Sequence, residues 1–155
     1  MSQRIDHGHE TWAGSATPRG LSVPAGLSTY DPPMATARLG SIALDCDSPA
    51  ALAEFWATML GGEVAFSSDA FVAVKTDRVW LAAVHVDGYQ PPSWPDGHLP
   101  KQMHLDLAVD DLDQAEAEAI RLGATRAQEQ SAPDRWRVLL DPAVHPFCLS
   151  TQIPE

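Results

Sequence analysis

The feature that most constrains the fold is an internal duplication with a spacing of about 63 residues. When the segment that starts at Ser41 is aligned with the segment that starts at His104, apolar residues fall on apolar residues, and Asp47 falls on Asp110. A repeat of this length is one supersecondary unit, and one copy leaves an apolar sheet face uncovered. The sequence therefore predicts two similar modules that pack against each other.

The first repeat has the pattern of a strand, a helix and then more strands. Residues 41–46 alternate between apolar and polar side chains, which predicts a half-buried strand. Asp47 and Ser48 can cap a helix, and Pro49 suits its first turn. Further strands are predicted over residues 70–76 and 79–86, with a turn at 77–78. The predicted helix has apolar residues at helical spacing on one side, which are Leu52, Phe55, Trp56, Met59 and Leu60.

The second repeat has the same order of predicted elements. Asp111 is a candidate helix N-cap with Gln114 three residues later, and strands are predicted over residues 136–140 and 146–152. The segment 141–146 contains Asp141-Pro142 and His145-Pro146, which predict a turn, and we assign it no catalytic role. Between the repeats, residues 88–100 hold four prolines and can form neither a helix nor a central strand. The inner face of the second helix is predicted to carry Leu112, Ala115, Ala119 and Ile120.

These elements predict an α+β fold, with two βαβββ modules that form a curved mixed-sheet cup and carry their helices on the outside. The modules span about residues 38–88 and 101–153 of a domain over residues 34–155. Residues 1–33 are rich in Gly, Ser, Thr and Pro and lack periodicity, so we expect a flexible N-terminal leader.

Composition excludes several classes of partner. The chain has 10 Lys and Arg residues against 21 Asp and Glu residues, a net charge of -11, and no basic cluster, so we expect no nucleic-acid partner. No apolar run approaches the length of a membrane span, and we expect no membrane association. Cys46 and Cys148 lie far apart, which favours reduced thiols, and the N-terminus lacks the pattern of a secretory signal. A cytoplasmic location is the resulting expectation.

Strand alternation identifies the residues that face the predicted cup. His104 and Asp106 share that face, and a carboxylate beside an imidazole can make it a general base or a metal ligand, so both are candidate catalytic residues. The alternative is a structural histidine beside a hydrogen-bonded strand residue. Trp94 lies on the proline-rich segment as a possible lid. The candidate ligand-binding residues are Ser41, Asp45, Trp80, Val84, Trp94 and Cys148.

Three segments give the chain a family resemblance: DSPAALAEFW at 47–56, QMHLDL at 102–107 and DPAVHPFC at 141–148. In this order, and within the duplicated pattern, they resemble the vicinal oxygen chelate superfamily, and more narrowly its glyoxalase-like and bleomycin-resistance-like members. The resemblance implies a divalent metal held by one residue from each of four strands. His104 matches one of these positions, whereas Ser41, Cys148 and Val84, or His85 with a one-residue shift, stand at the others. The ligand set thus favours no metal and no other cofactor, with a divalent metal as the alternative.

Three functions stay open at this point. The first is a metal-independent protein that binds a small molecule in the cup, where the acidic charge would favour cationic drugs. The second is a metal-dependent enzyme of the lyase, isomerase or dioxygenase type that uses His104. The third is a regulatory or interaction module. The resemblance also implies a homodimer, because the superfamily often pairs its modules between chains.

Overall fold

Each repeat folds into a strand, a helix and three further strands, as predicted. The computed structural model describes residues 36–95 and 97–154, so the predicted leader over residues 1–33 lies outside the described residues. The first repeat consists of β1 (Ser41–Cys46), α1 (Pro49–Met59), β2 (Glu63–Ser67), β3 (Phe71–Lys75) and β4 (Trp80–His85). The second consists of β5 (Leu105–Ala108), α2 (Leu112–Arg121), β6 (Thr125–Arg126), β7 (Trp136–Leu140) and β8 (Pro146–Ser150).

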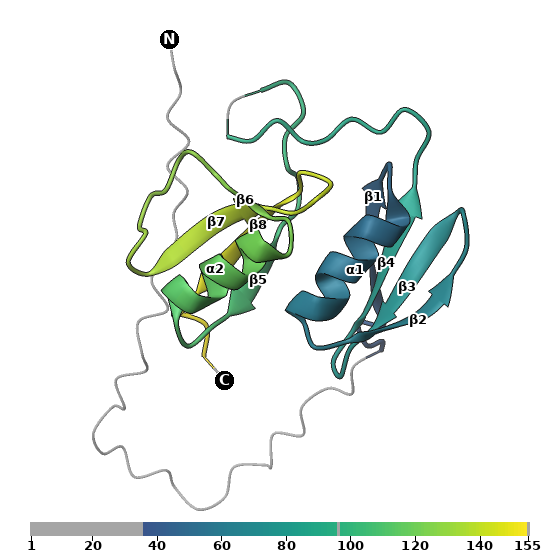
Figure 1. Ribbon diagram of the computed structural model, residues 1–155, viewed down its shortest axis with the longest axis horizontal. Helices are drawn as coiled ribbons and strands as arrows, with labels where there is room; N and C mark the ends of the chain where they lie inside the picture. The colour runs from purple at the N-terminus through teal and green to yellow at the C-terminus, as the bar shows by residue number, and fades with distance from the viewer. Residues whose placement is uncertain (1–35, 96, 155) are drawn as a thin grey trace, which may run out of the picture. The chain divides into compact units, whose positions relative to one another are not determined.

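The two repeats build two four-stranded mixed sheets of the same topology. The strand orders are β1-β4-β3-β2 and β5-β8-β7-β6. In each sheet the first strand pairs in parallel with the last strand of its module, and the remaining pairs are antiparallel. Each helix lies against the sheet of its own module (Figure 1). The predicted α+β class and the two βαβββ modules are confirmed.

Two strands are absent from the sequence predictions. All the residues of β2 are exposed, so burial imposes no alternation on its sequence, and β6 has only two residues. The register between β2 and β3 also shifts between Val64 and Phe66, which breaks the period of two. Alternation of apolar and polar residues identifies a strand only when one face of the strand is buried, so an exposed or very short strand is hard to predict from the sequence.

The structure confirms one prediction about the helices and corrects two. Asp111 caps α2 as predicted, because its side chain accepts a hydrogen bond from the backbone N–H of Gln114 at 3.0 Å. Ser48 occupies the N-cap position of α1, but its side chain makes no capping hydrogen bond, which corrects the prediction. Ile120 is 47% exposed rather than buried. It lies about 100° around the helix from the fully buried Ala119 and therefore falls beside the inner stripe.

The apolar core joins the two modules through aromatic side chains. Phe55 and Trp56 of α1 are both 2% exposed, and Phe147 of β8 is 1% exposed. The Phe147 ring meets Phe55 and Trp56 edge to face, with centroid distances of 5.8 and 5.3 Å. Such contacts add to the stability that apolar burial provides. No helix in the described ranges is long and apolar enough to cross a membrane.

A buried carboxylate provides a second link between the modules. The side chain of Asp141, in the turn between β7 and β8, is fully buried. It accepts hydrogen bonds from the Trp56 indole N–H at 3.1 Å and from the backbone N–H groups of Ala143 and His145 at 2.9 Å each. Burying a carboxylate costs stability unless donors surround it. We call residues 141–145 the Asp141 turn.

The Asp141 turn also holds the segment that connects the modules. The Tyr89 hydroxyl donates a hydrogen bond to the Ala143 carbonyl at 2.9 Å. Within the turn, Val144 has a φ of 68°, a conformation that β-branched residues rarely adopt. The hydrogen bonds to the Asp141 carboxylate stabilise this backbone conformation.

We expect Trp56→Phe to lower the free energy of unfolding by about 1–3 kcal/mol, because it removes one donor from a buried carboxylate while keeping an aromatic ring. Urea denaturation measures the change. Trp80→Phe is the matched control, since Trp80 is 41% exposed and should tolerate the change within about 0.5 kcal/mol. Equal effects of the two substitutions would show that the Trp56 to Asp141 hydrogen bond contributes nothing.

Candidate functional site

A pocket of about 330 Å³ lies beside β1, below the segment that connects the modules. Its walls come from β1, α1, residues 89–92 and 99–103, the start of β5, the end of the Asp141 turn and the start of β8. The apolar part includes Leu44, Trp56, Met103 and Phe147, and the polar part includes Asp45, Tyr89, Lys101, His104 and His145. A concave apolar site with a few polar groups is the usual form of a small-molecule site.

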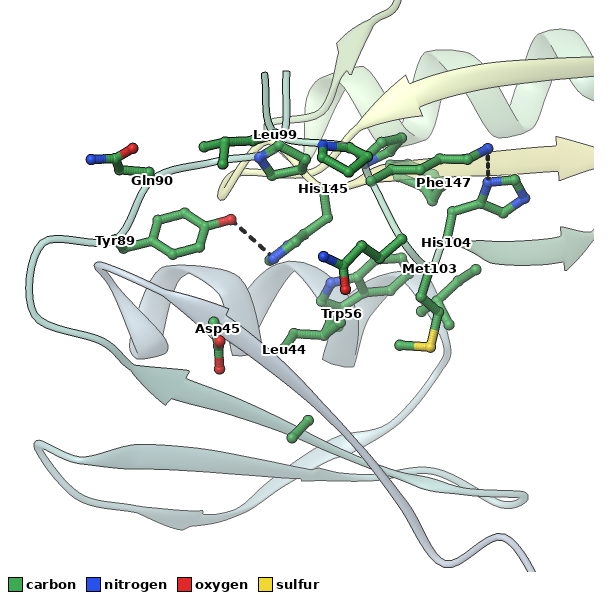
Figure 2. A pocket seen from close by; sticks show the side chains of 17 residues that line it. Leu44, Asp45, Trp56, Tyr89, Gln90, Leu99, Met103, His104, His145 and Phe147 are labelled. Carbon is green, nitrogen blue, oxygen red and sulfur yellow. Dashed lines mark hydrogen bonds between the residues drawn. The ribbon is translucent and has the colours of Figure 1, made fainter. Parts of the chain in front are cut away.

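One end of the pocket is formed by Tyr89 and His145, which point toward one another (Figure 2). The Tyr89 oxygen lies 3.0 Å from His145 Nε2, and His145 Nδ1 lies 3.0 Å from a carboxylate oxygen of Asp141. The carboxylate accepts from Nδ1 and thereby orients the imidazole. Burial, with the charge of Asp141 next in importance, raises the pKa of the Tyr89 phenol to about 12. Tyr89 is therefore a hydrogen-bond donor, not an anion, at neutral pH.

The other end of the pocket carries a chain of ionisable groups around His104. The Lys101 ammonium lies 2.6 Å from His104 Nδ1, and His104 Nε2 lies 3.1 Å from a carboxylate oxygen of Asp106. An ammonium only donates, so Nδ1 accepts, and Nε2 carries the proton that Asp106 accepts. Burial lowers the pKa of Lys101, and the nearby charge of Asp106 opposes this effect. His104 thus bridges a cation and an anion.

This geometry brings the two predicted catalytic residues together and limits what they can do. Asp106 orients the imidazole, as a carboxylate partner of a general base would. However, the Nδ1 lone pair that would accept a substrate proton already accepts from Lys101. The arrangement suits binding through Lys101 better than proton abstraction by His104.

Of the ligand-binding candidates in the first module, Asp45 lines the pocket. Val84 lies opposite Asp45 on β4, and Ser41 lies opposite Trp80 at the other end of the same strand pair. Ser41, Trp80 and Val84 are not among the residues that line the pocket. The open face of the first sheet is therefore not the pocket. The two are neighbours, because Ala43 and Asp45 of β1 also line the pocket.

The remaining two candidates lie close to the His104 chain without lining the pocket. The Trp94 ring lies below the Lys101 ammonium, with 5.6 Å between the nitrogen and the ring centroid, a cation–π contact. Cys148 lies opposite Asp106 on the neighbouring strand. Burial, followed by the effects of Asp106, raises the pKa of the Cys148 thiol to about 12, so it stays protonated at neutral pH.

The sequence predictions did not include Tyr89, Lys101 and His145. Tyr89 lies within the proline-rich segment and Lys101 follows it, and no periodicity there indicates which side chains point inward. A signal for His145 did exist, because Asp141 precedes it by four residues across a predicted turn, and a carboxylate at that distance can reach an imidazole. We interpreted that segment as a turn only.

The residues at the four positions where the family resemblance implies metal ligands do not fit a divalent ion. Ser41 and Val84 offer no imidazole, thiolate or carboxylate, which leaves His104 and Cys148 as the side chains of suitable chemistry, whereas a catalytic metal usually has three protein ligands. The alternative ligand His85 points elsewhere, since its ring lies 3.1 Å from the Asp47 carbonyl and 3.2 Å from Asp87. Within residues 36–95 and 97–154, no group of three His, Cys, Asp or Glu residues is placed to hold a metal ion.

One comparison with known proteins identifies a family. The model of a family described as "Glyoxalase-like domain" matches residues 41–150. No curated protein matches the chain in sequence.

Solved structures of the same fold share little sequence with the chain. A glyoxalase/bleomycin resistance protein/dioxygenase family enzyme from Burkholderia phytofirmans is 20% identical, with 76% of this chain and 100% of that chain covered and a TM-score of 0.57. A glyoxalase family protein from Enterococcus faecalis is 18% identical, covering 74% and 98%, with a TM-score of 0.56. A mutant of the fosfomycin resistance protein FosX from Listeria monocytogenes, complexed with Mn(II) and dihydroxypropylphosphonic acid, is 15% identical, covering 77% and 93%, with a TM-score of 0.57.

Proposed function

Because the chain belongs to the glyoxalase-like domain family, we propose that it binds a small molecule without using the divalent metal that the family resemblance implies. The observation that carries the proposal is the pocket of about 330 Å³, with an apolar wall and polar groups at both ends. Apolar contact supplies affinity in such a site, and the few polar groups select the ligand. The Lys101 ammonium supplies hydrogen-bond donors at one end, and the Tyr89 oxygen, which donates its proton to the Ala143 carbonyl, offers an acceptor at the other.

The pocket is accessible to a direct test through Ala43, an exposed residue of β1 that lines it. We expect some members of a panel of aromatic metabolites and antibiotics to raise the melting temperature of the wild-type protein. A ligand at ten times its dissociation constant stabilises the fold by about 1.4 kcal/mol, a shift of several degrees. In Ala43→Phe the larger side chain fills part of the pocket, so we expect the shift to disappear. Differential scanning fluorimetry measures both.

Ala108→Phe is the matched control. Ala108 is also an exposed alanine on an edge strand, but it does not line the pocket. A shift that survives Ala43→Phe, or that Ala108→Phe abolishes equally, would place the ligand elsewhere and refute the proposal.

The second candidate function is a metal-dependent enzyme that uses His104. It is favoured by His104 at one of the implied ligand positions and by the Mn(II) in the FosX structure. For this function, His104 would have to release Lys101 so that Nδ1 could bind a metal, while Asp106 could keep its hydrogen bond from Nε2–H.

We expect titration with zinc, nickel, manganese and iron(II) to give no stoichiometric binding that depends on His104, because Ser41 and Val84 at two of the implied positions are not metal ligands. Isothermal calorimetry on the wild type, His104→Ala and His85→Ala measures this. Stoichiometric binding that is lost in His104→Ala and kept in His85→Ala would favour the metal-dependent enzyme.

We also propose that the protein forms a homodimer through the open face of the first sheet. Three apolar side chains are exposed there, from 38% for Phe71 to 50% for Phe66, and these two rings stack at a centroid distance of 4.9 Å. Exposed apolar clusters of this kind often mark a protein interface. The three residues are Phe66, Phe71 and Trp80.

We expect the wild type to sediment as a dimer and Phe66→Glu as a monomer, because a charge in the interface would remain unpaired. Ile120→Glu is the control, since Ile120 is a similarly exposed apolar residue on α2. Sedimentation velocity at several concentrations measures the masses. A wild-type protein that stays monomeric throughout would disprove the dimer.

A further inference from the structure

The local charge of the pocket differs from that of the whole chain. The chain has a net charge of -11, which predicts a preference for cationic ligands. The pocket, however, is lined by one carboxylate, Asp45, which is exposed, and by one ammonium, Lys101, which is half-buried. Short-range contacts inside a partly buried site outweigh a distant surface charge that water and salt screen. The pocket itself is therefore the better guide to the ligand.

Lys101 differs from the other basic residues of the described ranges because it is half-buried and has no ion pair. The arginines on α2, β6 and β7 are paired with carboxylates: Arg121 with Glu118, Arg126 with Glu116, and Arg137 with Asp113 and Glu116. The other described basic residues, Arg38, Lys75, Arg78 and Arg135, are exposed to water.

The Lys101 ammonium is held in place by two neutral groups. It donates one hydrogen bond to His104 Nδ1 at 2.6 Å and lies over the Trp94 ring at 5.6 Å. The nearest acidic group in this chain of contacts, Asp106, bonds to the far side of the imidazole. Lys101 lines the pocket, and its ammonium has three donor protons, of which the contact with His104 uses one. Asp106 compensates the Lys101 charge only through the imidazole, because no carboxylate of the described residues contacts the half-buried ammonium directly, and an anionic ligand would offset the remaining cost of burial.

We propose that the ligand of this pocket carries a single carboxylate, which pairs with Lys101 Nζ while an apolar body contacts Leu44, Met103 and Phe147. The inference rests on the proposed small-molecule function and specifies its ligand class. A carboxylate suits the site better than a phosphate, because the pocket offers one lysine and also contains Asp45, which would repel a second negative charge. In this proposal, Lys101 supplies the positive charge that pairs with the ligand carboxylate. Asp106 orients the His104 imidazole, and the imidazole in turn holds the Lys101 ammonium in position.

Three probes with one aromatic body and different charges test the inference: indole-3-acetate, indole-3-acetamide and tryptamine. We expect calorimetry at neutral pH to give at least about tenfold tighter binding for the acetate than for the amide, since charge-assisted hydrogen bonds are the stronger ones. Tryptamine should bind most weakly. Lys101→Met should remove the advantage of the acetate, and Lys101→Arg should keep most of it. Lys75→Met, at an exposed position of β3, should change nothing.

Tryptamine binding as tightly as the acetate would overturn the inference, as would an acetate preference that survives Lys101→Met. If none of the three probes binds, the inference is also overturned. The proposed small-molecule function is tested separately. It is supported if any panel compound raises the melting temperature of the wild type but not of Ala43→Phe.

Discussion

The buried carboxylate of Asp141 is the constraint on which the junction of the two modules depends. A carboxylate without solvent must have donors on every side, and here they come from α1 of the first module and from the backbone of its own turn. The need for the Trp56 donor fixes how closely the first helix approaches the second sheet. The same turn positions the Ala143 carbonyl that receives Tyr89 and presents Phe147 to the aromatic core.

The pocket is a consequence of this junction. Its Tyr89 and His145 end consists of groups that the Asp141 turn holds, and its floor includes Trp56, the donor to Asp141. The opposite end is organised independently, by the alternation of β5 that puts His104 and Asp106 on one face. A molecule that reaches from Lys101 to Tyr89 would therefore contact both modules and the segment between them.

The sequence predicted the fold better than it predicted the pocket, for physical reasons. Burial imposes a period of two on β1 and β4 and a helical spacing on α1, so these elements are visible in the residue pattern. Strand alternation also brought His104 and Asp106 together correctly. It could not show that Lys101 would occupy the second nitrogen of His104, because Lys101 follows a proline-rich segment without a period. The exposed strand β2 left no signal for the same reason, since nothing buries one of its faces.

The position of Trp56 has a consequence for how this protein can change over evolutionary time. The side chain belongs to the core, donates to a buried carboxylate and forms part of the pocket floor, so any replacement that altered the ligand would also weaken the fold. The residues 89–95 and 97–103 belong to neither helix nor strand and contribute a large part of the pocket wall. Ligand preference can therefore diverge by substitution in this connecting segment, while the floor remains nearly invariant.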